Sequence, residues 1–187
     1  MVSLEIHTSG FLELPASVVT IGAFDGIHKG HQCLLSKAQE RATQLDVPLA
    51  VYTFDPPPKV YFNNCRLLTT LDEKKQLLKR FGVDHLIVGT FNETFIQQEV
   101  PVFIEELKKL SPLELWEGPN FQFGKGRKGN IEVLRRHFNV QVLHPVVTDE
   151  RELISSSRIR QLMQQGNYLQ AEHLLGWSLL NKSIMKI

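Results

Sequence analysis

The chain has 187 residues, of which 42% are hydrophobic and 22% charged, and its formal net charge is +1. This size and composition predict one globular domain, and the small charge disfavours a large electrostatic interface with nucleic acid. No apolar run approaches the roughly 20 residues needed to span a bilayer, no secretory h-region follows Met1, and two distant cysteines, Cys33 and Cys65, give no disulfide framework, so a cytoplasmic location is expected.

Apolar runs and helical spacings alternate along the chain. The prolines at 56–58 exclude a helix there, and 59–70 and 118–130 are expected to be loops. Leu4-Glu5-Ile6 is a weaker strand candidate. In chain order we expect five strands, at about 17–23, 49–54, 83–88, 112–117 and 140–143, and helices at about 30–45, 72–80, 101–110, 131–138, 155–165 and 168–175.

This alternation predicts one α/β domain over 1–187, with its core at about 17–176. We expect a Rossmann-like, five-stranded, mainly parallel sheet with helices on both faces. Ligands of such sheets bind beyond the carboxyl ends of the strands, at the topological switch point. The glycine-rich turn at 22–31 and the loop at 118–130 both follow strands, so they are expected to meet there. A Gly-x-Gly-x-x-Gly motif is absent, which disfavours a dinucleotide oxidoreductase.

The turn between the first long strand and its helix predicts an anion site. Glycines break the β-branched run, and the helix that follows offers unpartnered N–H groups and the positive end of its dipole. His28 and His31 add two imidazoles. No third ligand stands beside them in a zinc pattern, so phosphate is favoured over zinc. Taken alone, two such histidines are as often caps or surface groups.

A second informative stretch runs from Ile154 to Arg160. Three serines begin a helix, and Arg160 offers, one turn later, a guanidinium suited to phosphate oxygens. By themselves such serines are more often ordinary caps. Two phosphate-type helix starts in one α/β domain predict a triphosphate held at both ends.

Together these stretches resemble a known family. His28-x-Gly30-His31 resembles the His-x-Gly-His signature of the nucleotidylyltransferase superfamily, and the Ile154–Arg160 stretch resembles its Ile-Ser-Ser-Thr-x-x-Arg element. The adenylyltransferase module of bacterial FAD synthetases is similar over about 17–176 at the following strings: Gly22-Ala23-Phe24-Asp25-Gly26-Ile27-His28, Thr53-Phe54-Asp55-Pro56-x-Pro58, Leu68-Thr69-Thr70 and Gly118-x-Asn120-Phe121-x-Phe123-Gly124.

The resemblance implies an FMN adenylyltransferase with a Rossmann-like nucleotidylyltransferase fold. Such an enzyme transfers AMP from ATP, with Mg²⁺, to the phosphate of FMN, giving FAD and pyrophosphate by direct in-line attack. The implied partners are the small molecules ATP and FMN, with no nucleic acid or membrane, while oligomeric state and metal ligands stay open. Bacterial members usually carry a riboflavin kinase domain next, and the chain length leads us to expect that it is absent here.

The resemblance also implies roles for particular residues. Catalysis would rest on His28, His31 and Arg160. Asp25 is a candidate metal ligand, although a structural role in the turn is equally open, and Phe54 could simply pack in the core. Phosphate binding would involve Gly22, Ala23, Phe24, Asp25, Gly30, Ser155, Ser156, Ser157 and Arg160, and FMN binding Phe54, Phe62, Asn120, Phe121, Phe123 and Arg127.

Two positions depart from the family pattern. Pro57 stands where the usual Phe-x-Pro-His-Pro string has histidine, and Leu153 stands where many members have arginine. These losses leave open a flavin- or nucleotide-binding protein with weakened catalysis, acting as a carrier or regulator. A transferase for another acceptor, such as nicotinate mononucleotide or phosphopantetheine, is a third alternative, against which Phe54, Phe62 and the 120–124 string argue.

Overall fold

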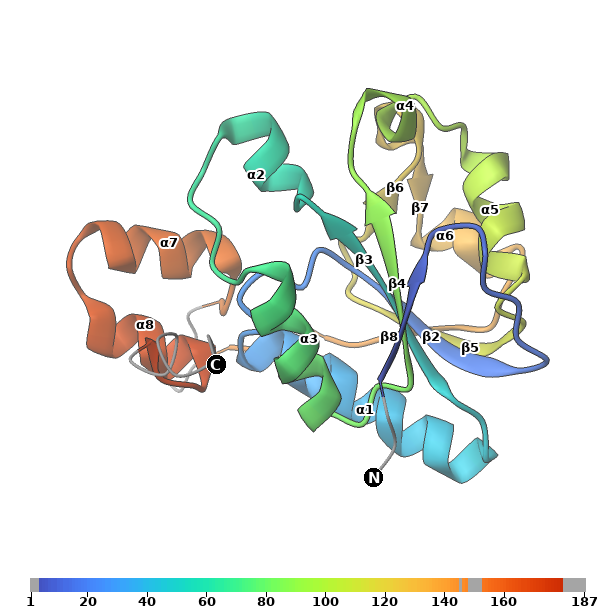
Figure 1. The fold of residues 1–187 in the computed structure, drawn as a ribbon, viewed down its shortest axis with the longest axis horizontal. Helices are drawn as coiled ribbons and strands as arrows, with labels where there is room; N and C mark the ends of the chain where they lie inside the picture. The colour runs from blue at the N-terminus through green and yellow to red at the C-terminus, as the bar shows by residue number, and fades with distance from the viewer. Residues whose placement is uncertain (1–3, 145, 148–152, 180–187) are drawn as a thin grey trace.

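In the computed structural model, which describes residues 4–144, 146–147 and 153–179, strands and helices alternate along the chain (Figure 1). The strands are β1 (Glu5–Thr8), β2 (Ser17–Ile21), β3 (Leu49–Asp55), β4 (His85–Thr90), β5 (Pro112–Glu117), β6 (Gln122–Phe123), β7 (Gly129–Asn130) and β8 (Val140–Val142). The helices are α1 (Lys29–Leu45), α2 (Pro58–Asn63), α3 (Leu71–Arg80), α4 (Glu93–Ile96), α5 (Val100–Lys108), α6 (Ile131–Arg135), α7 (Ser156–Gln164) and α8 (Tyr168–Leu175), with a 3₁₀ turn, η1 (Lys125–Arg127).

The main sheet has the order β1-β4-β3-β2-β5-β8, and all neighbouring strands in it run parallel. The predicted parallel α/β sheet is therefore confirmed. The predicted strand number of five was wrong, because β1 pairs with β4 as a sixth strand. Three of the four β1 residues are exposed, so its sequence carries little hydrophobic signal. The strand order reverses between β2 and β5, which makes their carboxyl ends the switch point.

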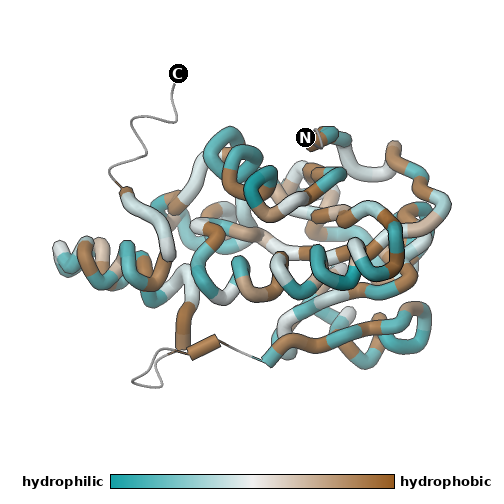
Figure 2. The backbone as a smooth tube through the Cα atoms, turned by 90° about the horizontal axis from the view of Figure 1, so that it is seen from below, coloured by the Kyte–Doolittle hydropathy of each residue, from teal (hydrophilic) through white to brown (hydrophobic). Residues whose placement is uncertain are grey.

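Helices cover both faces of the sheet, as predicted. Because neighbouring residues of a strand point to opposite faces, Val18 packs with α1 and α3 on one face, whereas Val19 packs with α5 and α6 on the other. Figure 2 shows hydrophobic and hydrophilic residues alternating along the helices, as expected for helices with one buried side. Among the residues that the structure describes, no helix is both long and apolar enough to cross a bilayer.

The last two helices, α7 and α8, pack on each other in a small apolar cluster of their own, beside the main layers (Figure 1). Hydrogen bonds tie them to the turn after β2: Trp177 Nε1 donates to the Gly26 carbonyl at 2.9 Å, and Gln32 Nε2 donates to the Leu175 carbonyl at 2.7 Å. This docking brings the start of α7 to the start of α1. Residues 180–187, which follow α8, lie outside the described part.

Two stretches predicted to be loops contain regular structure. Residues 58–63 form α2, so the expectation that the prolines exclude a helix was wrong. Pro58 is the first helical residue, where no backbone donor is needed and the fixed φ of proline suits the helix. Residues 122–130 form a small antiparallel hairpin of β6 and β7 around η1. These short elements border the second of the two cavities described below.

Candidate functional site

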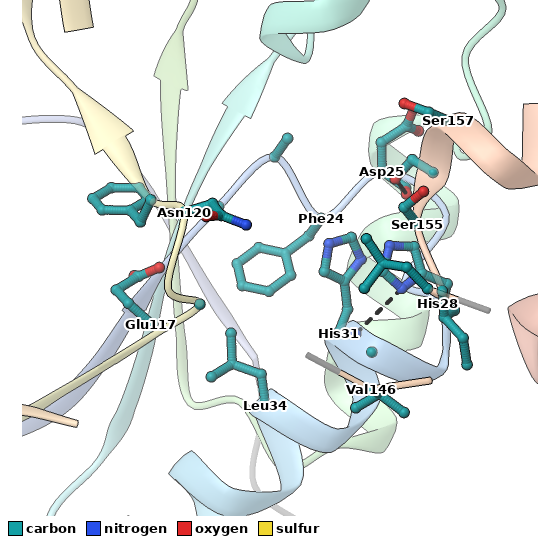
Figure 3. Close-up of a pocket in the computed structure, with 18 of the residues that line it drawn as sticks. Phe24, Asp25, His28, His31, Leu34, Glu117, Asn120, Val146, Ser155 and Ser157 are labelled. Atoms are coloured by element: carbon teal, nitrogen blue, oxygen red, sulfur yellow. Dashed lines mark hydrogen bonds between the residues drawn. The ribbon is translucent and has the colours of Figure 1, made fainter. Parts of the chain in front are cut away.

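A cleft of about 430 Å³ opens at the carboxyl ends of β2 and β5. It is lined by the turn after β2, by the 118–121 segment after β5, and by the first residues of α7 (Figure 3). The two segments that the sequence placed at the switch point therefore meet, and the triple-serine stretch joins them. The predicted residues that line this cleft are Gly22, Ala23, Phe24, Asp25, His28, Gly30, His31, Asn120, Phe121, Ser155, Ser156, Ser157 and Arg160.

The turn after β2 has an unusual backbone. Phe24 and Ile27 have positive φ values of 45° and 36°, a region that bulky and β-branched side chains rarely adopt. Such strain persists only where the surroundings enforce it, often at functional sites. Here Gly26 N donates to Thr69 Oγ1 at 2.9 Å, and both Phe24 and Ile27 are fully buried. The turn delivers His28 to the N-cap of α1.

The two predicted imidazoles lie side by side in the cleft (Figure 3). Their rings stack with centroids 3.7 Å apart, and the His31 ring meets Phe24 edge-on at 5.2 Å. The His31 backbone N–H donates to His28 Nδ1 at 3.4 Å, so the proton of a neutral His28 ring belongs on Nε2, which can donate to a ligand. A Cβ at Gly30 would come within 3.2 Å of the His28 ring, which explains the glycine between the histidines.

Burial sets the charge of this pair. It lowers the pKa of His28 to about 4, and it lowers the pKa of His31 well below the ordinary value of 6.5, with the neighbouring His28 adding to the effect. Both rings are therefore neutral at pH 7. His31 Nδ1 is buried without a hydrogen-bond partner among the residues that the structure describes. A polyphosphate bound here would accept hydrogen bonds from neutral imidazole N–H groups. Its negative charge would in turn raise the pKa of both rings.

Asp25 and Arg160 form a buried ion pair that joins three distant segments. Asp25 Oδ1 accepts the backbone N–H groups of Leu68 and Thr69, both at 3.0 Å, while Asp25 Oδ2 pairs with Arg160 Nη2. Arg160 Nε donates to the Arg66 carbonyl at 2.8 Å. The contacts of Asp25 therefore show the structural role that the sequence left open. Both of its carboxylate oxygens already accept hydrogen bonds from protein donors.

The three serines at the start of α7 also have protein partners. Ser155 caps the helix by accepting the Arg158 backbone N–H, and Ser156 Oγ donates to the Asp25 carbonyl at 2.9 Å. Ser157 Oγ accepts from Lys59 Nζ at 2.6 Å. The hydroxyls therefore hold α7 against the turn after β2 and against α2. The first-turn backbone N–H groups of α7 complete the anion-binding potential of this wall.

Three charged residues of the site were missed by the sequence reasoning. Lys74 is 1% exposed, and its Nζ donates to the Ala23 carbonyl at 2.8 Å and to Thr53 Oγ1 at 3.1 Å; burial lowers the pKa of Lys74 to about 8. Glu117 accepts the Ile21 backbone N–H at 2.6 Å, and burial raises its pKa well above the usual value. Lys59 lines the cleft. Of the three, only Glu117 could have been suspected from the sequence, because it stands at the end of a predicted strand.

A second cavity, of about 710 Å³, adjoins the cleft, and seven of its 16 lining residues are phenylalanine. Pro58, Lys59 and Phe121 line both spaces, so the two meet at the start of α2. Asn120 lines the first cleft and not the second. Of the residues predicted to bind FMN, this cavity brings together Phe54, Phe62, Phe121, Phe123 and Arg127, and it adds Phe91, Phe95 and Phe103, which the sequence reasoning did not assign.

The predicted aromatic residues differ in exposure. Phe54 and Phe123 are each 7% exposed and pack in the core cluster of the α5 face, so each has a structural role besides lining the cavity. Phe123 reaches the core because the β6–β7 hairpin folds its ring onto Phe103. Phe62 is 63% exposed, and its ring meets Phe91 edge-on at 5.6 Å. An exposed aromatic ring at a cavity rim is free to contact a ligand.

A parallel sheet whose order reverses beside a cleft flanked by two helix N-termini defines a Rossmann-like nucleotidylyltransferase fold. The model of the FAD synthetase family matches residues 12–158, and the chain belongs to this family.

Individual relatives agree with this assignment. A Geobacillus thermodenitrificans (strain NG80-2) protein, whose name combines riboflavin kinase and FMN adenylyltransferase, is 46% identical over 168 residues, which cover 90% of this chain and 94% of that protein. The bifunctional riboflavin kinase/FMN adenylyltransferase of Haemophilus influenzae is 35% identical over 87% of this chain, but this chain spans only 56% of it. A Streptococcus pneumoniae crystal structure described as a macrolide-efflux protein superposes with a TM-score of 0.79 at 30% identity, covering 95% of this chain and 62% of that one.

Proposed function

We propose that this protein is an FMN adenylyltransferase, which joins the AMP of ATP to the phosphate of FMN and releases pyrophosphate. One observation carries the proposal: a cleft with two helix N-termini and an aromatic cavity share Pro58, Lys59 and Phe121 as common walls. The cleft suits a polyphosphate and the cavity suits a flat, apolar ring. Their junction is where an FMN phosphate could reach the α-phosphorus of ATP.

The phosphates of ATP would lie between the start of α1 and the start of α7. His28 Nε2 would donate to a phosphate oxygen, with the backbone donors of both helices completing the site. Arg160 lines the cleft, but its Nε and Nη2 are bound to protein acceptors, so we assign it mainly to holding the Asp25 turn in place. Because Asp25 is likewise occupied, Mg²⁺ would be held mainly by phosphate oxygens, where it would neutralise charge.

The reaction needs little chemistry from the protein. An oxygen of the FMN phosphate, already an anion at pH 7, attacks the α-phosphorus in line, and the bond to the oxygen bridging the α- and β-phosphorus breaks. The bonding electrons leave with pyrophosphate, so neither a general base nor a covalent enzyme intermediate is required. His28, His31 and the α7 N-terminus would stabilise the charge that develops on the leaving oxygens.

Lys59 offers a donor near Pro57, which stands where the family pattern has a histidine. Pro57 is buried and cannot donate, but two residues later the Lys59 ammonium stands at the junction of the two cavities, 2.6 Å from Ser157 Oγ. We assign to Lys59 the role of drawing the FMN phosphate toward ATP. Its exposed side chain on the short helix α2 can exchange the serine hydroxyl for a phosphate oxygen.

The aromatic cavity would hold the flavin ring. Phe54, Phe62, Phe91 and Phe121 offer apolar surfaces, and Arg127, at its border, offers a cation to the polar edge of the ligand. We propose that the enzyme works on free substrates in the cytoplasm. The free thiols of Cys33 and Cys65 are compatible with that reducing compartment.

Incubation of the protein with ATP, Mg²⁺ and FMN tests the proposal, with FAD and pyrophosphate as the expected products. Binding of FMN and ATP without product would support a carrier or regulator instead. Product only with nicotinate mononucleotide or phosphopantetheine would show a transferase for another acceptor.

A further inference from the structure

Three side chains with metal-ligating atoms converge at the edge of the main sheet, where β1 pairs with β4. Glu5 and His7 stand on β1, and His85 is the first residue of β4. Residues two apart in a strand point to the same face, and Glu5 pairs directly with His85 in the parallel register. The strand pairing therefore brings all three together. The cleft lies at the carboxyl ends of the parallel strands, whereas His85 lies at the amino end of β4. The cluster is therefore near the end of the sheet opposite the cleft.

The distances within this cluster match those of a metal site. His7 Nε2 lies 3.2 Å from His85 Nδ1 and 3.7 Å from Glu5 Oε2, and His85 Nδ1 lies 3.5 Å from the same Glu5 oxygen. A cation placed near the centre of this triangle would be about 2.0–2.1 Å from all three atoms, which is the usual distance from zinc to imidazole nitrogen and carboxylate oxygen. The spacing of the three ligand atoms therefore already suits one shared ion.

We propose that Glu5, His7 and His85 bind one transition-metal ion, with Zn²⁺ as the best match. Two imidazole nitrogens and one carboxylate oxygen favour zinc and its neighbours over Mg²⁺ or Ca²⁺, which prefer oxygen ligands alone. Three protein ligands leave a fourth position for water. The side chains of His7 and His85 are 23% and 16% exposed, so an ion can enter from solvent.

The ion would hold the edge strand β1 in place. This strand has four residues, three of them exposed, and within the sheet it pairs with β4 alone. Two of its side chains and one from β4 would share the metal, which would link the strands independently of their backbone hydrogen bonds. The proposed ion would thus act on the strand pairing, at a place distinct from the transfer reaction proposed above.

The test is a titration of the metal-free full chain with Zn²⁺ against a chromophoric chelator. We expect one ion per chain, bound in the micromolar range or tighter, a rise in Tm on adding Zn²⁺, and visible absorption bands of a low-coordinate site with Co²⁺. His7→Gln and Glu5→Gln should each weaken binding about tenfold or more and remove the Tm shift. His137→Gln, a change at an exposed histidine on the turn after α6, is the matched control and should bind like the unchanged protein. Circular dichroism checks that each variant is folded.

Three results would overturn the proposal. One is Zn²⁺ affinity that is unchanged in folded His7→Gln and Glu5→Gln, and another is no binding at micromolar concentrations. The third is binding that disappears in His31→Gln but survives His7→Gln, which would place the ion at the stacked imidazoles. Failure of the transferase assay would leave this titration unaffected, so the two proposals fail separately.

Discussion

The phosphate cleft and the aromatic cavity are neighbours, but they are built differently. The cleft stands on strands and helices of the main layers and on α7, and buried polar contacts such as Asp25–Arg160 and Lys74–Ala23 fix its shape. The cavity is lined by β3 and α5 and closed by the short elements α2, α4 and the β6–β7 hairpin, and seven of its 16 lining residues are phenylalanine. Fixed donors suit charge that develops in a transition state, whereas aromatic walls suit the binding of a ground-state ring.

This contrast predicts that changes in the two regions have separable effects. Substitutions at the cleft should lower kcat or destabilise the fold, because its donors and ion pair are preorganised. Substitutions at the cavity should raise KM for FMN, because in the proposed complex its aromatic walls would contact the flavin alike before and during the reaction.

Breaking the buried ion pair should have the largest effect. Asp25→Ala leaves the Arg160 guanidinium, itself 9% exposed, without its partner, and the loss of one member of a buried pair costs about 3–5 kcal/mol. Urea unfolding of Asp25→Ala measures this loss. In the double variant Asp25→Ala/Arg160→Met much of the stability should return, because no unpaired charge is left. A loss below about 1 kcal/mol in the single variant would contradict the structural role of the pair.

Removing an imidazole should lower the rate without affecting the fold. His28→Ala and His31→Ala should each lower kcat for FAD formation about a hundredfold, corresponding to about 3 kcal/mol of barrier. The KM for FMN should stay within about twofold, since neither ring lines the aromatic cavity. Steady-state kinetics with HPLC detection of FAD measures both parameters. Nearly full kcat in both variants would remove the histidines from the mechanism.

The depressed pKa of His28 predicts a loss of stability in mild acid. The unfolded chain takes up a proton at His28 near pH 6.5, whereas the folded chain takes it up near pH 4. The contribution of neutral His28 to the unfolding free energy is therefore fully present above pH 6.5. This contribution is lost as the pH drops toward 4, which lowers the unfolding free energy by up to about 3 kcal/mol. Urea unfolding at pH 7 and pH 4.5 should show a smaller difference for His28→Asn than for the unchanged protein. Equal differences would argue against burial of this imidazole.

The aromatic cavity should give the smallest effect. Phe62→Ala removes an exposed ring at the cavity rim and should raise KM for FMN about fivefold, corresponding to about 1 kcal/mol, with kcat within about twofold. Tyr168→Ala is a matched control, because Tyr168 is an exposed aromatic residue on α8 that does not line the cavity. A fall in kcat comparable to that of His28→Ala would contradict the prediction that the cavity affects KM and the cleft affects kcat.

The sequence was sufficient to predict the cleft because its parts are local. The glycines and histidines of the 22–31 turn stand within a few residues of one another, as do the serines at 155–157. Each group starts a helix, and both helix starts carry a recognisable anion-binding pattern. The pairing of Asp25 with Arg160 joins residues 135 positions apart, and no local pattern shows it. Lys74 resembled a solvated helix residue, and only the packing of α3 under the Ala23 turn buries it.

The aromatic cavity was only partly predictable. Residues 90–100 show no clear periodicity, so Phe91 and Phe95 could be assigned only after α4 was seen to fold over Phe54. The sequence indicated β1 only weakly for a related reason. This strand is defined by its pairing with β4, whereas most of its side chains are exposed and leave no hydrophobic pattern.

Transfer from ATP labelled at the α-phosphorus tests the central claim most directly. If the cleft and the cavity hold ATP and FMN side by side for direct attack, the label appears in FAD, the unlabelled β- and γ-phosphates leave as pyrophosphate, and the protein stays unlabelled. Label bound covalently to the protein, or label remaining in ATP while FMN and ATP are both bound, would contradict this account.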